Sequence, residues 1–211
     1  MLFKDRADAG RRLAIELAKY KGADAVVYAL PRGGVVLGYE IASNLSIPLD
    51  LIITRKIGYP GNEECAACAV AEDGHMICDR SAASFLDQEW LDIQARKEMQ
   101  EAKRRRAVYL KGRKPLPAAG KVVIIVDDGV ATGLTILLAI TELKHNEPKK
   151  IIVAVPVSSE DAAEKIRSEV DELIVLDIPA DFKAVGNYYE KFAQLIDEEV
   201  ILFMENTVEK P

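Results

Sequence analysis

Two adjacent carboxylates, Asp127 and Asp128, have the clearest capacity for chemistry, because they directly follow a β-branched apolar run at 121–126. A loop of small and hydroxyl-bearing residues at 129–135 comes next and opens a helical segment. The N–H groups of such a loop suit a phosphate, glycines allow close backbone approach, and carboxylates accept hydrogen bonds from hydroxyls. A ligand that carries a phosphate and sugar hydroxyls would therefore fit this stretch. The candidate binding residues are Asp127, Asp128, Gly129, Val130, Ala131, Thr132, Gly133, Leu134 and Thr135.

The elements that must position these residues alternate between strand and helix. The predicted strands cover 24–30, 49–54, 121–126, 150–155 and 172–176. The predicted helices cover 5–20, 34–45, 133–146 and 159–169. Several of the strand runs are apolar on both alternations, which fits strands buried on both faces of a parallel sheet. The pattern predicts an α/β fold: a doubly wound, mainly parallel sheet with helices on both faces and ligands at the carboxyl ends of its strands.

Two stretches interrupt this alternation. Residues 61–78 predict a loop and a short hairpin that turns at Asp73 and Gly74. Residues 87–111 predict one long helix, which Gly112 and Pro115 would end. We expect the segment 79–113 to be a helical insertion, or a flap that covers the site and excludes water.

The composition is that of a soluble globular chain, which we interpret as a single domain spanning residues 1–211. With 28 basic and 34 acidic residues the formal net charge is −6, which argues against the basic footprint of general nucleic-acid binding. No apolar run reaches the roughly 18 residues that a membrane-spanning helix needs, and the first ten residues lack the pattern of a signal peptide. We expect a cytoplasmic protein that acts on small molecules, without nucleic-acid or membrane partners. Assembly into a homo-oligomer stays open.

A second candidate site follows the strand at 24–30, where the chain reads Pro-Arg-Gly-Gly. Gly33 and Gly34 permit unusual backbone angles, and Arg32 offers a planar fork to phosphate oxygens. A simple turn between a strand and a helix would explain the same residues. Taken alone, the motif favours neither interpretation.

A third candidate is the cationic pair Arg55 and Lys56, which follows the predicted strand at 49–54. These two cations could face the same anion as Arg32. The alternative is a solvated strand end, and the residues alone support both interpretations equally.

The stretch at 122–135 resembles the phosphoribosyl-pyrophosphate motif of type I phosphoribosyltransferases, in which apolar residues precede two acidic residues and a small loop that ends in Thr-Gly-x-Thr. A helix cap needs only one polar side chain, so two acids together with Thr-Gly-x-Thr exceed what capping requires. The segments 55–62, 182–189 and 197–200 are similar to an uncharacterised subgroup of phosphoribosyltransferase-like proteins. The resemblance therefore covers most of the chain.

The resemblance implies a reaction in which a nitrogenous base or an amine displaces pyrophosphate from the ribose of phosphoribosyl pyrophosphate. It implies that the acidic pair faces the ribose 2′ and 3′ hydroxyls, and that the loop at 131–135 cradles the 5′-phosphate. It also implies that the loop after the first strand binds pyrophosphate, often with a strained peptide bond. Mg²⁺ is expected as the cofactor, held mainly by substrate oxygens and water. The residues implied for pyrophosphate are Arg32, Gly33, Gly34, Arg55 and Lys56.

One departure from the family pattern narrows the acceptor. The residue before Thr-Gly is Ala131, where hypoxanthine-guanine enzymes place an Asp against the purine, so a 6-oxopurine acceptor is in doubt. A phosphoribosyl- or nucleotide-binding regulator of the same fold with little or no turnover stays an alternative, because a sensor could keep both acids. A phosphatase with an Asp nucleophile would need Asp-x-Asp-x-Thr, which the adjacent acids do not match.

The tail at 178–211 is expected to form a small hood with the N-terminus, including a helix near 189–200. Phe182 or Tyr188 could stack there on a flat base, although aromatic residues near a chain end more often close a core.

Cysteines form the last group, at positions 65, 68 and 78. An odd number argues against a disulfide framework, and zinc would need a further ligand, so we expect small buried cysteines.

Overall fold

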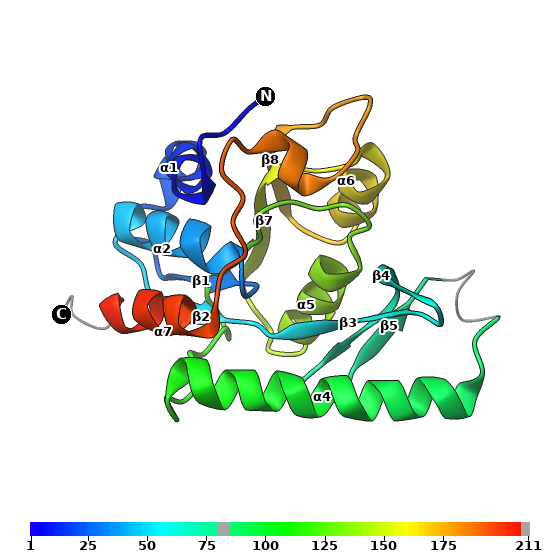
Figure 1. Ribbon diagram of the computed structural model, residues 1–211. Helices are drawn as coiled ribbons and strands as arrows, with labels where there is room; N and C mark the ends of the chain where they lie inside the picture. The colour runs from blue at the N-terminus through cyan, green and yellow to red at the C-terminus, as the bar shows by residue number, and fades with distance from the viewer. Residues whose placement is uncertain (80–84, 208–211) are drawn as a thin grey trace.

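The computed structural model describes residues 1–79 and 85–207, and its centre is a five-stranded parallel sheet. The strand order is β2-β1-β6-β7-β8, and every neighbouring pair runs parallel (Figure 1). The strands are β1 (Ala25–Ala29), β2 (Leu49–Leu51), β6 (Val122–Val126), β7 (Lys150–Val157) and β8 (Glu172–Asp177). All five predicted strands are present, because their β-branched apolar runs can be buried on both faces.

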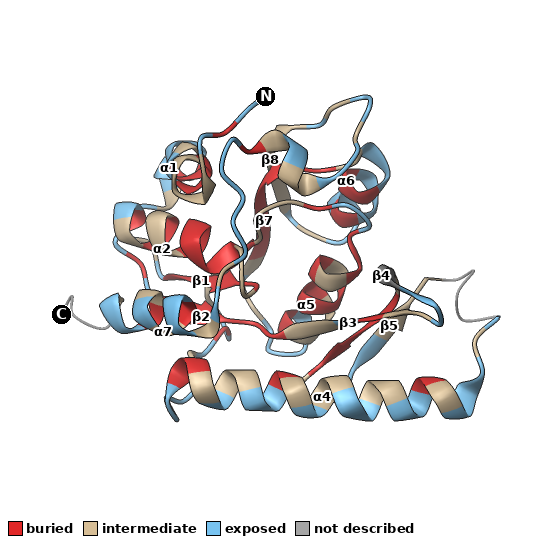
Figure 2. Cartoon of the chain, viewed as in Figure 1, coloured by how far each residue is buried: buried red, intermediate tan, exposed pale blue. Residues whose placement is uncertain are grey.

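Helices cover both faces of this sheet. The helices are α1 (Arg6–Glu16) and α2 (Gly34–Leu45) on one face, with α5 (Leu134–Lys144) and α6 (Glu160–Arg167) on the other. Alternate strand residues serve the two layers: Val27 and Ile124 pack with α1 and α2, whereas Val26 and Ile125 pack with α5 and α6. Strands β1, β2, β6 and β7 and the inner faces of these helices are accordingly buried almost throughout, whereas the edge strand β8 is half-buried (Figure 2). The predicted doubly wound α/β fold is confirmed.

A second sheet projects from this core and is antiparallel. It consists of β3 (Thr54–Tyr59), β4 (Asn62–Ala71) and β5 (Met76–Cys78), against which the long helix α4 (Gln88–Leu110) packs. We call these four elements the arm; they extend along the lower right of Figure 1. The turn at Asp73 and Gly74 and the long helix match their predictions, but two expectations were wrong. Residues 62–71 form a strand rather than a loop, and Thr54 begins a new strand instead of ending β2.

The N-terminal segment and the tail lie side by side next to α1. The tail holds the short helix η2 (Val185–Tyr188) and the helix α7 (Asp197–Asn206). The predicted helix at 189–200 was wrong in place, because the backbone of this stretch bonds to the N-terminus: Phe3 N donates to Tyr188 O at 2.8 Å, and Glu190 N donates to Phe3 O at 2.8 Å. The helix starts only where acidic residues complement its N-terminus.

A disulfide joins β4 to β5 through Cys68 and Cys78, which corrects the expectation of free cysteines. The two residues are register partners across the hairpin, with Cα atoms 3.9 Å apart. The count of cysteines could not show this, because the pairing depends on how the turn at 73–74 aligns the strands. Cys68 is fully buried, as expected, whereas the side chain of Cys65 lies outside the described part of the structure.

Within residues 1–79 and 85–207, no helix is both long and apolar enough to cross a membrane.

Candidate functional site

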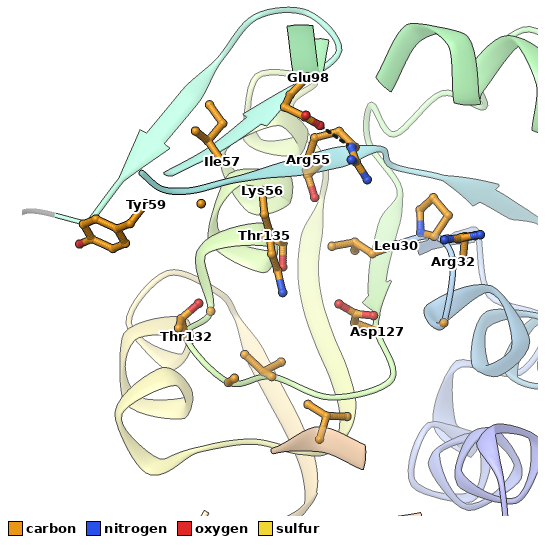
Figure 3. Close-up of a pocket in the computed structure, with 18 of the residues that line it drawn as sticks. Leu30, Arg32, Arg55, Lys56, Ile57, Tyr59, Glu98, Asp127, Thr132 and Thr135 are labelled. Carbon is orange, nitrogen blue, oxygen red and sulfur yellow. Dashed lines mark hydrogen bonds and ion pairs between the residues drawn. The ribbon is translucent and has the colours of Figure 1, made fainter. Parts of the chain in front are cut away.

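A cavity of about 830 Å³ opens at the carboxyl ends of β1 and β6, and the arm forms its roof (Figure 3). This is the edge at which open α/β sheets bind ligands. Five segments that are far apart in the sequence contribute to it. The lining residues are 30–33 after β1, 54–61 of the arm, Trp90, Gln94, Lys97 and Glu98 of α4, 127–133 and Thr135 after β6, and Val185 of the tail.

The loop after β6 is held in place by the next strand. Val130 N donates to Val157 O at 2.9 Å, and Ser159 Oγ donates to Ala131 O at 2.6 Å. Gly133, with φ of 83°, lets the chain turn sharply into α5. Because an α-helix leaves its first N–H groups without partners inside the helix, the start of α5 offers hydrogen-bond donors at the cavity wall. The loop is thus a fixed cup with the properties of an anion site.

The two carboxylates of the site lie in different electrostatic surroundings. Burial raises the pKa of Asp127 well above its ordinary value, and the neighbouring charge of Asp128 adds to this rise. Burial also raises the pKa of Asp128, but Arg6 opposes the rise, because its Nε donates to Asp128 Oδ2 at 2.8 Å. Asp127 Oδ1 accepts from the backbone N–H of Asp128 at 2.8 Å. The pair therefore presents hydrogen-bond acceptors for hydroxyls without two uncompensated charges.

The turn after β1 lies directly against these acids. The peptide bond between Pro31 and Arg32 is cis. A Cβ built at Gly33 would lie 1.8 Å from Asp128 Oδ2, so only glycine allows this approach. Gly34 does not line the cavity; its missing side chain lets α2 pack on the end of β6, where a Cβ would lie 2.8 Å from the backbone oxygen of Val126. The turn thus places Arg32 and Gly33, but not Gly34, in the cavity wall.

The two cations of the pair on β3 have different contacts. Lys56 points from the roof toward the loop between Asp127 and Thr132 (Figure 3). Arg55 lines the same cavity, but its Nε donates to Glu98 Oε2 of α4 at 2.8 Å. Of the two, Lys56 is therefore the cation that points into the cavity, and Arg55 joins β3 to α4.

Two of the side chains expected at the ligand lie elsewhere. Phe182 and Tyr188 stack on one another, with ring centroids 5.6 Å apart, and neither lines the cavity. The tail contributes Val185 to the cavity. Val185 packs closely on Gly129, because a Cβ added at Gly129 would lie 2.5 Å from Val185 Cγ1. The side chain of Leu134 is buried beside Leu138 between α5 and the arm, so only the backbone of this residue could serve a ligand.

Sequence reasoning missed several residues of the cavity. Tyr59 and Trp90 provide its aromatic side chains, and Lys97 adds a cation. The spacing of Trp90, Gln94 and Lys97 along a predicted helix could have shown that they share one face. Arg6 is different, because nothing in the sequence signals that it pairs with an acid 122 positions away.

The acidic groups of the cavity do not form a metal cage. No cluster of three or more His, Cys, Asp or Glu residues suited to a metal ion occurs in the part of the chain that the structure describes. Glu98 is paired with Arg55, and Asp128 is paired with Arg6. A cation in the cavity would therefore be held mainly by oxygens of a ligand and by water, as Mg²⁺ commonly is.

Comparisons with known proteins match most of this chain. The family model described as "Phosphoribosyl transferase domain" matches residues 3–190. Proteins from two strains of Mycobacterium tuberculosis, each named "Putative phosphoribosyl transferase", are 39% identical over 206 residues, which is 97% of this chain. The chain spans only 46% of the length of these curated relatives.

Solved structures share the fold. The crystal structure of protein TT1426 from Thermus thermophilus has a TM-score of 0.81 and 38% identity, and the match covers 98% of this chain and 99% of that one. The AQ2163 protein from Aquifex aeolicus has a TM-score of 0.51 and 16% identity, over 82% of this chain and 74% of that one. The second likeness shows the fold alone.

Proposed function

The chain belongs to the phosphoribosyl transferase family, and from this premise we propose that it moves the 5-phosphoribosyl group from phosphoribosyl pyrophosphate to a nitrogenous base or an amine, with release of pyrophosphate. One observation carries the proposal: a single cavity holds Asp127, Asp128, the cup at the start of α5, and two unlike cations, Arg32 and Lys56. A sugar with a phosphate at one end and pyrophosphate at the other needs these three kinds of group.

The carboxylates would bind the ribose, and the loop would bind its 5′-phosphate. Asp127 and Asp128 would accept hydrogen bonds from the 2′ and 3′ hydroxyls, because both line the cavity beside the loop. The backbone of 131–135 and the hydroxyls of Thr132 and Thr135 would donate to the phosphate. Leu134 would take part only through its backbone.

The pyrophosphate would lie between the turn after β1 and the roof. Lys56 offers a point charge from the roof. Arg32 lines the cavity and carries a bidentate fork, but its Nη1 lies 3.8 Å from Asp197 Oδ1, so it would turn to the pyrophosphate when the ligand binds. Arg55 would act less directly, because Glu98 already accepts from its guanidinium. Mg²⁺, held by pyrophosphate oxygens and water, would neutralise part of the charge on the leaving group.

In the reaction, the nucleophilic nitrogen forms a bond to the anomeric carbon of the ribose while the bond from that carbon to pyrophosphate breaks. The electron pair of the broken bond leaves with pyrophosphate, and positive charge develops on the sugar. Asp127 and Asp128 would stabilise that positive charge, while Arg32 and Lys56 would stabilise the growing negative charge. Catalysis would therefore rest mainly on positioning and charge complementarity.

The proposal specifies the acceptor only by its chemical class. Ala131 offers no carboxylate to a base, so a 6-oxopurine is a poor candidate. Tyr59 and Trp90 give the cavity flat apolar surfaces for an aromatic ring. We propose small molecules as the only ligands of the cavity, and the cytoplasm as the location of the reaction.

The test is to supply phosphoribosyl pyrophosphate and Mg²⁺, to measure binding by calorimetry, and to measure pyrophosphate release with a panel of bases and amines. Asp127→Asn and Asp128→Asn should each weaken binding by about 1–3 kcal/mol, because charged hydrogen bonds are lost. Asp8→Asn is the matched control, since Asp8 pairs with Arg12 on the surface of α1. Unchanged binding in the double variant would remove the acids from the site. Binding without turnover across the whole panel would instead indicate a regulatory protein.

A further inference from the structure

Arg6 is the residue outside the proposed substrate contacts that the structure connects most closely to them. It lies at the start of α1, and its Nε donates to Asp128 Oδ2 at 2.8 Å. Its Nη1 donates to Ala193 O at 2.7 Å, and its guanidinium lies 3.9 Å from the centroid of the Phe192 ring. The side chains of Arg6 and Asp128 are only 11% and 16% exposed. A guanidinium that is stacked and doubly hydrogen-bonded in this way has little freedom to move.

Asp128 is held from other directions as well. Gly33 leaves room for Asp128 Oδ2 on the side of the turn after β1. The hydroxyl of Tyr189 donates to the backbone oxygen of Asp128 at 2.6 Å. The carboxylate is therefore enclosed by the N-terminal helix, the turn after β1 and the tail. Its Oδ2 faces Arg6 and the turn, which leaves Oδ1 for a ligand.

We propose that Arg6 is a positioning residue, which holds the carboxylate of Asp128 charged and correctly oriented for the ribose and fixes it relative to the tail segment 192–193. This inference rests on the proposed function, because it names the ribose as the ligand. Arg6 itself would touch no reacting atom. Arginine suits this task better than lysine, because a planar guanidinium can donate in two directions while its face stacks on an aromatic ring.

The charges around Asp128 set the direction of the expected pH effect. Arg6 from α1 and Lys56 from β3 favour the ionised carboxylate, whereas burial opposes it. Asp127 on the same loop and the hydroxyl of Tyr189 on the tail are the other titratable groups that face it. Removal of Arg6 should therefore raise the pKa of Asp128. The variant should lose the ionised form, and with it ribose binding, at a higher pH than the unaltered protein does.

The experiment compares Arg6→Gln and Arg6→Lys with the unaltered protein. Calorimetry with phosphoribosyl pyrophosphate and Mg²⁺ from pH 5 to 9, roughly the range in which carboxylates with raised pKa values titrate, gives the affinity profile. For Arg6→Gln we expect an affinity about tenfold or more weaker at neutral pH, and an acid limb displaced to higher pH. Arg6→Lys keeps the positive charge but loses the planar guanidinium. The acid limb of its affinity profile should therefore move less than that of Arg6→Gln, although its affinity should still fall. Where turnover is measurable, KM should rise more than kcat falls.

The control is Arg12→Gln, since Arg12 lies on the same helix and pairs with Asp8 at the surface. It should leave the affinity profile unchanged. A carbon-13 NMR titration of the Asp128 carboxyl in the free protein supplies a readout that needs no ligand. The inference would be overturned if the titration midpoint of Asp128 were unchanged in both folded Arg6 variants. Equal losses in affinity at every pH would overturn it as well. Failure of the unaltered protein to bind phosphoribosyl pyrophosphate would instead refute the proposed function.

Discussion

The parallel core and the arm contribute unlike surfaces to the same cavity. The core supplies a fixed floor, in which Asp127, the loop after it and Gly33 are held by buried strands and close packing. The arm supplies a roof of long polar and aromatic side chains on an antiparallel sheet and one helix. Substitutions that displace groups of the floor should therefore reduce binding and reaction most. Loss of a single charge on the roof should reduce them less.

The largest effect is expected on the floor, for Gly33→Ala. A Cβ at this position would lie 1.8 Å from Asp128 Oδ2, so the carboxylate or the turn must move. A displacement of about 1 Å at a reacting group commonly costs on the order of 100-fold. We expect a loss of that order in kcat/KM, together with weaker binding of phosphoribosyl pyrophosphate in calorimetry.

The control for this change is Gly22→Ala, because Gly22 is remote from the cavity and has open space around it. Its positive φ of 67° should cost some stability but no affinity. Near-normal affinity in a folded Gly33→Ala protein would show that the floor is more adaptable than the close packing indicates.

The next effect concerns the stability of the arm. The Cys68–Cys78 disulfide closes a loop with a sequence separation of 10, and loss of such a loop constraint should lower the free energy of unfolding by about 2–3 kcal/mol. Denaturant unfolding of Cys68→Ala/Cys78→Ala measures this directly, and the unaltered protein under reducing conditions is the matched comparison. Amide exchange should accelerate in β4 and β5 but not in β6 and β7. Equal acceleration in both sheets would show that the arm and the core unfold as one unit.

A third prediction tests the junction between the two regions. Glu142 of α5 has a buried Oε2 without a hydrogen-bond partner, and burial together with Asp73 and Glu72 of the arm raises its pKa to about 7. The folded protein thus binds this proton more tightly than the unfolded chain, so stability should fall as the pH rises from about 4.5 to about 7. Glu142→Gln should remove this fall and gain on the order of 2 kcal/mol at pH 8. An unaltered slope in the variant would assign the pH dependence to other groups.

The same division explains what the sequence could reveal. The core strands were predictable, because runs such as 121–126 are apolar on both alternations and have only one suitable environment. The strand β4 was missed, because its small and charged residues (NEECAACAVA) show no apolar alternation. Its pairing with β3 and β5 is decided by tertiary contacts.

The candidate site divides in a similar way. The loop at 127–135 lies within one local motif, so its residues could be identified together. The tail could not be placed in this way, because Phe182 and Tyr188 stack on each other and the backbone near Tyr188 bonds to Phe3. Arg6 was not predictable either, since its partner is set by the meeting of α1 with the end of β6. Residues recruited from distant segments leave no spacing pattern in the sequence.

The smallest effect is expected on the roof, for single charges of the arm. Lys56 points toward the loop, whereas Arg55 donates to Glu98, so adjacent cations on one strand should differ in their contribution to binding. Lys56→Gln should weaken phosphoribosyl pyrophosphate binding by about tenfold, because one charge-assisted hydrogen bond to a phosphate is lost. Arg55→Gln should weaken it less and should mainly lower the stability of the contact between β3 and α4. Calorimetry and thermal unfolding of the two variants separate these effects. A larger loss of affinity for Arg55→Gln than for Lys56→Gln would mean that a bound ligand releases Arg55 from Glu98, and the roof would then be the adaptable wall of the cavity.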